Sequence, residues 1–533
     1  MWQWMAWRQH DPRGSAPRGY GWLCWIAGLC WWPVMVPAAE APATGEVQQY
    51  QRALVSAAAD VQLKLPDLSG YTEPAIRQQL GRWHGRPAEL VQERLVGKVE
   101  IRKFFSAGRL VTWSRRQNQF PRIVMIRHGL ATLAQLSRSM PDVVVDQGQG
   151  RYIARLPLAV AADGGLLIDK GQTLLLSEER GAFIVNAGQF YLLHGQLLGW
   201  REDTGKPATF VDKHDFRPFY TAWSNSDTYI YGSTVAHLGS SSSKAYGLTL
   251  SSYTEADEAF APMKIDRHKP PRGWILGNRF EDMFYGFYCY EAADIAVIGN
   301  EYAKNIYYGI DPHDRSHRLI IANNHVWGSK VRHGIIVSRD VSDSFIFRNI
   351  SHDNANSGIM LDRQSNRNVV AQNVSYHNGG DGIVLYESDD TLIFANQVYR
   401  NAHHGIRFRN SRHVRMVDNL VVSNARFGIY GQLRDLDHSG RDLKLDPYLR
   451  RTSGLVAGGL LSGNRSGTIF VDKPDYLKIQ GVSMNPQYDS RGRIKDGLEG
   501  TLASYRAEIM AAVANPQQQW VLAQPGALPS GGQ

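Results

Sequence analysis

The chain is short of cysteine, and this shortage limits the ways in which it can be stabilised. Its 533 residues include three cysteines, of which Cys24 and Cys30 lie in an apolar segment near the N-terminus. The rest of the chain keeps only Cys289, which can form no intramolecular disulfide and no cysteine metal site. We therefore expect a hydrophobic core to hold the fold together, and 43% of the residues are hydrophobic.

Long apolar runs are also scarce. One covers residues 21–32, follows a basic segment, stops at Pro33, and is shorter than the roughly 20 apolar residues of a spanning helix. The small residues Val36 and Ala38 then fit a cleavage site, so residues 1–38 are interpreted as a secretory signal peptide. An uncleaved membrane anchor is the alternative. No later segment is apolar enough to span a bilayer, so we expect an exported protein without a membrane span after signal removal.

Acidic residues are outnumbered by basic ones. The chain contains 59 Lys and Arg against 50 Asp and Glu, which gives a formal net charge of +9. This excess favours a polyanionic partner, and the candidate classes are nucleic acid, an anionic membrane and an acidic polysaccharide. Composition alone does not choose among them.

Glycine and asparagine recur with a fixed period through the centre of the chain. Seven glycines are spaced by 23 to 25 residues, each follows an asparagine by 8 to 10 residues, and a second asparagine series lies five residues after the first. Periods of this length indicate a solenoid, and the regular leucines of a leucine-rich repeat are missing. The glycines are Gly286, Gly309, Gly334, Gly358, Gly382, Gly405 and Gly428; the asparagines are Asn278, Asn300, Asn324, Asn349, Asn373, Asn396 and Asn419, then Asn305, Asn354, Asn378, Asn401 and Asn424.

The residues around each glycine predict an all-β fold, a right-handed parallel β-helix with about 23–25 residues per coil. Apolar residues stand one and three positions after most glycines, for example Ile359 and Leu361, and alternation along a strand points them inward. Asparagine suits turns because it tolerates the left-handed conformation, and stacked amides can bond one another from coil to coil. We therefore expect a structural role for the asparagines.

The rest of the chain is divided around this solenoid. Residues 39–60 are expected to be a linker, residues 61–240 an N-terminal β region of early coils with insertions, and residues 241–470 the β-helix core with its groove. Pro87–Val96 predicts a short helix, because proline is accepted at a first helical position. Residues 471–533 are expected to form a C-terminal cap, with a helix near 498–513 and a flexible tail.

The outward positions of the repeating strand collect polar and aromatic side chains. They lie two and four residues after each glycine, and a further polar residue stands at the strand end, five residues after the glycine. A polyanion lying along the axis would meet one cation or hydrogen-bonding group per coil, with plain solvated surface as the alternative for any single residue. The residues that we expect to bind it are Tyr308, Asp362, Arg363, Tyr386, Glu387, Arg407 and Arg409.

One tetrapeptide on this face, Asp311-Pro-His-Asp314, predicts acid–base chemistry. Its histidine, His313, points outward, and Arg339 should lie within a few ångströms of it, one coil further on. A neutral imidazole can remove a carbon-bound proton, while a guanidinium neutralises a neighbouring carboxylate and the enolate-like charge that develops. His313, Arg339, Asp311 and Asp314 are therefore the predicted catalytic residues.

A metal site is the alternative for this segment. Asp311, His313 and His317 together could ligate zinc or manganese, but the flanking arginines and the alternation of the strand disfavour it. Calcium-binding nonapeptide repeats are absent apart from a single Gly-Gly-Asp-Gly at 379–382. We expect no metal and no cofactor.

The export signal, the solenoid and the Asp-Pro-His-Asp motif together resemble the periplasmic mannuronan C5-epimerases of alginate-producing Gram-negative bacteria. The resemblance covers nearly the whole chain after the signal, and its strongest segments are Tyr308-Gly-Ile-Asp-Pro-His-Asp-Arg-Ser-His317 and His333-Gly-Ile-Ile-Val-Ser-Arg-Asp340. It implies calcium-independent inversion at C5 of mannuronate residues within the polymer, in the periplasm. It also implies that His313 is the base, that Arg339 neutralises the carboxylate, and that water returns the proton on the opposite face. The implied partners are alginate, rather than nucleic acid, and the proteins of the alginate export complex.

Two other functions remain open from the residues alone. A polysaccharide lyase begins with the same removal of the C5 proton and then expels the 4-O-linked sugar. A non-catalytic polyuronate-binding scaffold of the secretion machinery would use the groove without His313. The resemblance decides for the epimerase.

Overall fold

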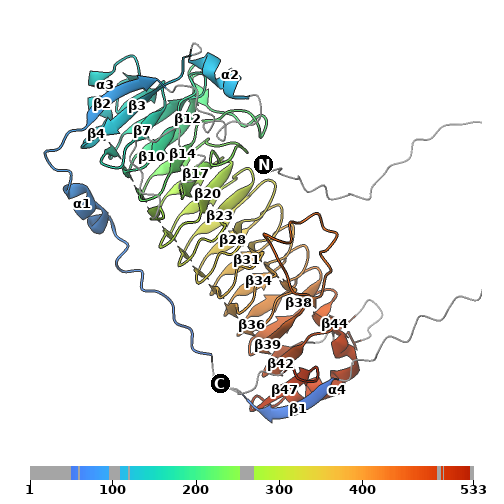
Figure 1. Cartoon of the computed structure of the whole chain (residues 1–533). Coiled ribbons are helices and arrows are strands. Elements are labelled where there is room, and N and C mark those ends of the chain that lie inside the picture. The colour runs from blue at the N-terminus through green and yellow to red at the C-terminus, as the bar shows by residue number, and fades with distance from the viewer. Residues whose placement is uncertain are drawn as a thin grey trace, which may run out of the picture.

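The computed structural model describes residues 50–57, 61–94, 109–117, 120–252, 269–485, 487–488, 494–495 and 497–527. The expected signal peptide, residues 1–38, lies outside the described residues. The described chain winds into a rod of stacked coils whose strands form three long sheets (Figure 1). Neighbouring coils pair through parallel strands, which confirms the β-helix predicted from the glycine and asparagine period.

Sheet 1 runs the length of the rod and has 15 strands. All of its strands pair in parallel except at its C-terminal end, where β47 pairs antiparallel with both β42 and β1. In spatial order they are β4 (Leu130–Thr132), β8 (Gly165–Ile168), β11 (Gln189–Leu193), β15 (Asp227–Tyr231), β18 (Arg272–Leu276), β21 (Ala296–Ile298), β24 (Ile320–Ala322), β27 (Phe345–Phe347), β30 (Val369–Ala371), β33 (Leu392–Phe394), β36 (Val414–Val417), β39 (Ser453–Ala457), β42 (Tyr476–Gln480), β47 (Gln518–Ala523) and β1 (Gln51–Ser56).

Sheet 2 carries the predicted site residues and also has 15 strands. Its first pair, β2 with β3, is antiparallel, and the pairs that follow are parallel. In spatial order they are β2 (Glu89–Arg94), β3 (Arg122–Arg127), β7 (Leu158–Val160), β10 (Ile184–Asn186), β14 (Tyr220–Ala222), β17 (Gly247–Ser251), β20 (Tyr285–Tyr290), β23 (Tyr308–His313), β26 (Ile335–Ser338), β29 (Ile359–Asp362), β32 (Ile383–Tyr386), β35 (Ile406–Arg409), β38 (Phe427–Gln432), β41 (Gly467–Val471) and β46 (Leu498–Gly500).

Sheet 3 closes the third side of each coil. A small separate pair is formed by β44 (Gln487–Tyr488) and β45 (Ile494–Lys495). The strands of sheet 3 are β5 (Val144–Asp146), β6 (Arg151–Ala154), β9 (Thr173–Ser177), β12 (Gln196–Arg201) with β13 (Lys206–Pro207) beside it, β16 (Thr234–Ala236), β19 (Arg279–Glu281), β22 (Glu301–Ala303), β25 (His325–Trp327), β28 (Ile350–His352), β31 (Val374–Tyr376), β34 (Gln397–Tyr399), β37 (Leu420–Val422), β40 (Leu460–Ser462) and β43 (Ser483–Met484).

The described helices are short. At the N-terminal end of the rod are α2 (Arg109–Arg116) and α3 (Leu133–Ser139), whereas α1 (Glu73–Gly81) lies on the side of the rod (Figure 1). At the C-terminal end a 3₁₀ turn (Thr501–Tyr505) leads into α4 (Arg506–Val513), in the stretch where a helix was expected. Among the described residues, no helix has both the length and the apolar character that crossing a membrane requires.

The core fills the inside of the coils. The residue after each repeating glycine points inward: Ile359, Ile383 and Ile406 are fully buried, as the alternation predicted. The first asparagine series forms a continuous ladder at buried turns from Asn278 to Asn419, and the second series does so from Asn354 to Asn424. Asn373, for example, donates from its side-chain amide to Asn396 Oδ1 at 3.0 Å and accepts from Asn349 in the coil before. A buried amide that bonds in both directions leaves no unpaired polar group, which confirms the structural role predicted for these residues. Asn305 accepts a bond from the Met283 N–H, but its Nδ2 has no partner among the described residues.

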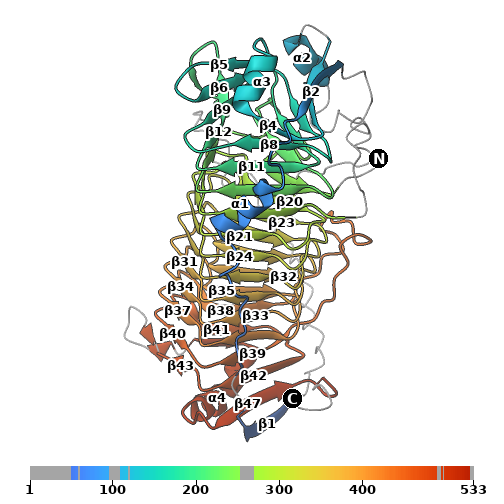
Figure 2. The same cartoon turned by 90° about the vertical axis from the view of Figure 1, so that its left-hand side faces the viewer.

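The segment before α2 runs along the outside of the solenoid and touches both of its ends. It pairs β1 with the C-terminal cap and β2 with β3 at the other end. Between them, Leu63 and Leu68 pack on the outer face of sheet 1 against a cluster that contains Ala322, Phe347 and Ala371. Figure 2 shows α1 lying over the same face. Sheet edges are thereby covered at both ends of the rod.

Two details of this segment differ from what its local sequence indicates. The predicted helix at 87–96 is wrong: Pro87 forms an isolated bridge to Leu130, and β2 pairs with β3. The open edge of β3 offers unpaired backbone groups, and satisfying them outweighs a weak local helix signal. The stretch expected to be a linker, residues 39–60, contains the strand β1, because β47 offers a similar edge.

Candidate active site

The strands of sheet 2 place two rows of side chains on the outer face of the solenoid, each row running from coil to coil. The turns after these strands place a third row there. Strand register aligns Tyr290, His313, Ser338, Asp362 and Tyr386 on successive rungs. Each rung lies about 4.8 Å from the next. The second row lies two residues earlier in each strand. It contains Tyr288, Asp311, Ile336, Met360, Val384, Arg407 and Tyr430.

The third row exists because the residue after each of the strands β23, β26, β29 and β32 adopts the left-handed conformation. The φ angle is +39° at Asp314, +64° at Arg339, +55° at Arg363 and +48° at Glu387. In an extended strand, consecutive side chains point to opposite faces, so His313 and Asp314 would be kept apart. The left-handed residue, which costs about 1 kcal/mol, breaks the alternation and brings both side chains to the same side. Non-glycine residues held in this conformation cluster at functional sites.

His313 and Asp314 form a hydrogen-bonded pair. The imidazole Nδ1 bonds the Asp314 carboxylate, and the His313 side chain is 20% exposed. Burial opposes the charged imidazolium, but the Asp314 hydrogen bond and the nearby carboxylates outweigh it, so the pKa of His313 is raised above 6.5. Burial works against ionised Asp314 too, yet its bond to His313 holds the pKa of that carboxyl below its usual value. The ring of Tyr288 lies 5.8 Å from the imidazole, between ring centres.

Arg339 lies next to this pair, one coil further on, as predicted. Its Nη1 is 3.8 Å from Asp314 Oδ1, and its Nη2 is 3.4 Å from Asp446 Oδ2. Its Nε is buried and has no hydrogen-bond partner among the described residues. Arg363 occupies the equivalent place in the following coil, with its Nη1 3.2 Å from the same oxygen of Asp446. Two guanidinium groups therefore stand on adjacent rungs beside the imidazole.

Asp311 is buried on the outer face, with 2% of its surface exposed, and its Oδ1 has no hydrogen-bond partner among the described residues. Burial raises the pKa of this carboxyl to about 7, because the neighbouring carboxylates Asp314 and Asp362 add to the cost of ionisation and only His313 opposes it. Burial likewise raises the pKa of Asp362. A protonated Asp311 can donate a hydrogen bond, whereas its ionised form cannot.

The other predicted binding residues fall into two groups: those whose side chains could contact a polymer, and those already paired with other protein groups. Tyr308 stacks on His333 at a ring distance of 6.0 Å, and Arg407 lies 5.3 Å from the Tyr386 ring centre and 3.5 Å from Asp381. Arg409 is 8% exposed and is held by Glu387 at 2.8 and 3.1 Å, with its guanidinium 3.7 Å from the centre of the Tyr386 ring. Arg409 and Glu387 are thus paired with each other, rather than presenting free charges to a polymer.

Two kinds of site residue were missed in the sequence. Tyr288 and Tyr290 lie two and four residues after Gly286, so the same rule that selected Asp311 and His313 would have found them. Arg441 and Asp446 come from the long connection between β38 and β39, and no repeat signal marks them.

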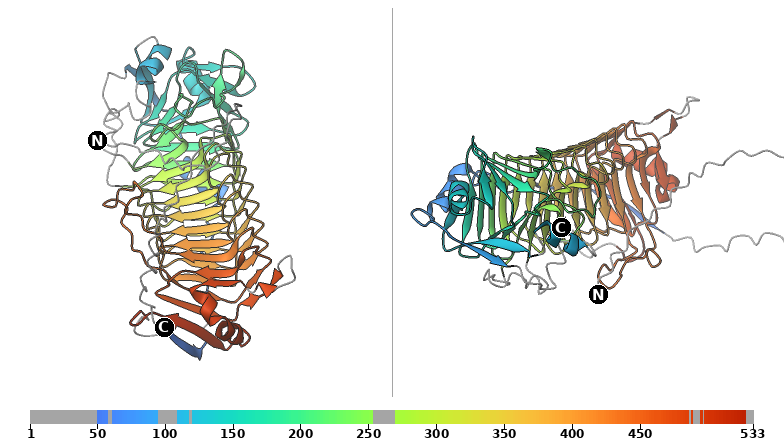
Figure 3. Two further views of the ribbon diagram at one scale, coloured as in Figure 1. Left: turned by 90° about the vertical axis from the view of Figure 1, so that its right-hand side faces the viewer. Right: turned by 90° about the horizontal axis from the view of Figure 1, so that it is seen from above.

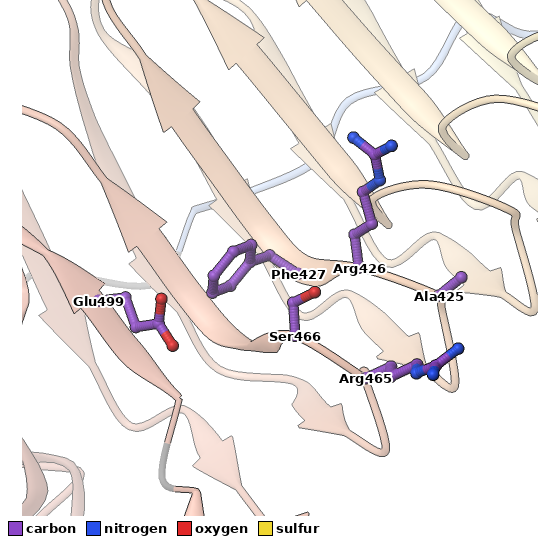
Figure 4. Close-up of a pocket in the computed structure, with 6 residues that line it drawn as sticks. All are labelled: Ala425, Arg426, Phe427, Arg465, Ser466 and Glu499. Atoms are coloured by element: carbon purple, nitrogen blue, oxygen red, sulfur yellow. The ribbon is translucent and has the colours of Figure 1, made fainter. Parts of the chain in front are cut away.

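A further hollow lies along the same side of the solenoid, towards its C-terminal end. It has a volume of about 560 Å³ and is lined by Arg426, Phe427, Arg465, Ser466 and Glu499 together with Ala425. Figure 4 shows Arg426 and Arg465 on the turns that precede β38 and β41. The cationic character of the outer face therefore continues beyond Arg407.

Metal ligation is not indicated by the arrangement around His313. His317 lies at the turn after β23, where its Nδ1 is 3.2 Å from the Arg315 carbonyl oxygen. Within the described parts of the chain, no three His, Cys, Asp or Glu side chains are grouped so as to hold a metal ion. Cys289 is buried and forms no disulfide, and burial raises the pKa of its thiol to about 12.

Known proteins resemble this chain in sequence and in fold. The family model described as the right-handed beta helix region matches residues 268–394 and 363–433. The mannuronan C5-epimerase of Pseudomonas aeruginosa is 47% identical over 440 residues, which are 82% of this chain and 80% of that protein. Mannuronan C5-epimerase AlgG of Azotobacter vinelandii is 44% identical over 460 residues, 85% of each chain. A crystal structure of the periplasmic alginate epimerase AlgG superposes with a TM-score of 0.75 at 40% identity, covering 80% of this chain and 100% of that one.

Proposed function

The chain belongs to the mannuronan C5-epimerases of alginate, and from that premise we propose that His313 and Arg339 carry out its proton transfer. His313 Nε2 removes the proton from C5 of a mannuronate residue. The electron pair of that C–H bond moves into the C6 carboxylate, which becomes an enediolate. A water molecule then delivers a proton to the opposite face of C5, and the hydroxide left behind is neutralised by the proton that His313 releases to solvent. The product is guluronate within an unbroken polymer.

The observation that supports this assignment is the cluster of His313, Asp314 and Arg339 on two adjacent coils. Asp314 accepts from Nδ1, which leaves Nε2 as the basic nitrogen and stabilises the imidazolium that forms. Arg339 neutralises the substrate carboxylate and the second negative charge that develops on it. Asp311, which is buried with a pKa of about 7, donates a hydrogen bond to the same carboxylate while it is protonated.

Of His313, His333 and His404 on this face, only His313 has a raised pKa. Burial lowers the pKa of both His333 and His404 to about 3, and neighbouring arginines add to the effect. Such imidazoles stay neutral at all working pH values but accept a proton poorly. His313 alone of these three has a side-chain hydrogen bond to a carboxylate, which stabilises the imidazolium that forms when the base takes up a proton.

The substrate is a polyanion that lies along sheet 2. Tyr308, Arg363, Tyr386 and Arg407 contact sugars on either side of the reacting residue, while Asp362, Glu387 and Arg409 hold those groups in place. The protein acts in the periplasm after removal of residues 1–38, without calcium, and works alongside the proteins of the alginate export complex. The excess of basic residues fits an acidic polysaccharide.

The reaction is tested by incubating the protein with polymannuronate in deuterated water. We expect guluronate signals in the NMR spectrum, deuterium at C5 and an unchanged chain length. Ultraviolet absorbance from a 4,5-double bond, together with falling chain length, would instead identify a lyase. Polymer binding with no exchange at C5 would identify a scaffold protein.

The pH dependence follows from the His313–Asp314 pair. The base must be neutral, so activity should rise as the pH increases through the raised pKa of His313. Asp314→Asn removes the anion that stabilises the imidazolium, so the pKa of His313 falls and the acidic limb of the activity profile moves to lower pH. Initial exchange rates of wild type and variant across the pH range measure this shift. Asp340→Asn, an equal charge change at an exposed residue one coil further on, should leave the limb in place.

A further inference from the structure

The connection between β38 and β39, residues 433–452, is much longer than the equivalent connection in the preceding coil, which is residues 410–413. It does not stay with its own coil. Figure 1 shows this orange loop leaving the rod near β38, and the left panel of Figure 3 shows it running back alongside earlier coils. We call residues 433–452 the return loop.

Side-chain contacts dock the return loop on four consecutive coils of the candidate site. Asn410 and Arg434 exchange two hydrogen bonds, of 2.7 and 2.9 Å. Arg441 donates to Glu387 at 2.5 Å, and its own side chain is 5% exposed. Further back, Gln364 donates to the carbonyl oxygen of Pro447 at 2.8 Å. The earliest coil that the loop reaches is the one that contains Arg339.

Asp446 is the residue that makes this last contact. Its side chain is 6% exposed, and its Oδ2 lies 3.4 Å from Arg339 Nη2 and 3.2 Å from Arg363 Nη1. One carboxylate oxygen therefore bridges two guanidinium groups on adjacent rungs. Without it, two like charges about one rung apart would repel each other in a partly desolvated site, where screening by salt is weak.

We propose that Asp446 is a positioning residue for the proton-transfer reaction. It holds Arg339 and Arg363 side by side as a receptor for uronate carboxylates, and it does so from a loop that lies four coils further along the solenoid. The bridge uses only Nη2 of Arg339. Arg339 Nη1 lies 3.8 Å from Asp314 Oδ1, beyond hydrogen-bond distance, so the N–H groups of Nη1 remain available for the substrate. This inference rests on the proposed role of Arg339.

The alternative role for Asp446 is to compete with the substrate for the two arginines. If Asp446 occupied the place of the substrate carboxylate, it would have to leave before a sugar could bind, and removing its charge would tighten binding. A positioning role predicts the reverse pattern: the ground-state affinity changes little, and turnover falls because the carboxylate of the transition state meets a misplaced guanidinium.

The test is Asp446→Asn, which keeps the shape of the side chain and removes its charge. We expect kcat for C5 exchange to fall about tenfold, while KM for polymannuronate changes less than twofold. The matched control is Asp442→Asn in the same loop, where either side chain can accept the backbone N–H groups of Lys444 and Leu445. This control should keep wild-type turnover. Thermal unfolding of both variants checks that they are folded.

Asp446→Glu supplies the second measurement. It restores the charge, so it should recover most of the turnover lost in Asp446→Asn. The proposal is overturned if Asp446→Asn binds polymer more tightly with unchanged kcat, if both asparagine variants behave alike, or if the glutamate variant recovers nothing. Failure of the proposed role of Arg339 is recognised separately, because Arg339→Met would then leave kcat for C5 exchange unchanged.

Discussion

His313→Gln should slow C5 hydrogen exchange about a thousandfold while leaving polymannuronate binding nearly unchanged. General-base catalysis contributes about 10² to 10⁴ in rate, and glutamine keeps a polar side chain of similar length without a basic nitrogen. The Arg339 and Arg407 guanidinium groups that would attract the polymer remain in place. Exchange into deuterated solvent, followed by NMR, and binding measured by titration with polymannuronate give the two quantities separately.

The matched control is His317→Gln, four residues further along the same turn. His317 bonds only a backbone carbonyl among the interactions that the structure describes around it, so its replacement should leave the exchange rate at the wild-type level. A comparable loss in both variants would point to a shared structural or metal-binding role. Undiminished exchange in His313→Gln would remove His313 as the base.

The fold was predictable because the residues that repeat, asparagine and glycine, each have a structural role in every coil. Asparagine ladders need one amide per coil at a buried turn, and the glycines fit where a side chain would collide with the next coil. A Cβ on Gly358, for instance, would lie 2.1 Å from Ser375 Oγ. The phase of the repeat then identifies which residues face outward, and it placed His313 and Arg339 on neighbouring coils.

The site was only partly predictable, for two physical reasons. Strand alternation indicates which way a side chain points but not how deeply it is covered. Arg409 was therefore expected to meet the polymer, although its side chain is only 8% exposed and is held by Glu387. Contacts from outside the repeat leave no periodic signal. Asp446 reaches Arg339 through a loop that starts four coils later, and only the folded chain shows it.

Secondary structure in the N-terminal region was also hard to predict, because contacts with distant strands decide it. The segment at residues 87–96 has a proline at an accepted helical position, yet Glu89–Arg94 form a strand because β3 has a free edge beside them. Local propensity is worth a few tenths of a kcal/mol per residue, and the backbone hydrogen bonds of an open sheet edge outweigh it. Long-range pairing of this kind has no signature in the segment itself.

Arg339→Met should lower kcat for exchange by a hundredfold or more, with a smaller effect on polymer binding. A donor that meets charge developing in the transition state is worth about 10² to 10³ in rate, and methionine keeps the length of the stem without the guanidinium. Arg363 and Arg407 still attract the polymer in this variant, so affinity should fall only modestly. Steady-state exchange rates at several polymer concentrations separate the two effects.

Arg339→Lys distinguishes charge from geometry. Lysine keeps the positive charge but lacks the planar guanidinium that can bond both oxygens of a carboxylate. The kcat of Arg339→Lys should therefore be higher than that of Arg339→Met but well below the wild-type value. Arg367→Met, which removes an exposed arginine paired with Asp343 in a neighbouring turn, is the matched control and should be neutral. If Arg339→Met lost affinity in proportion to its rate, Arg339 would bind substrate and transition state equally. The stabilisation of the enediolate would then have to come from the protonated Asp311, which lies on the same face and whose pKa of about 7 allows it to donate near neutral pH.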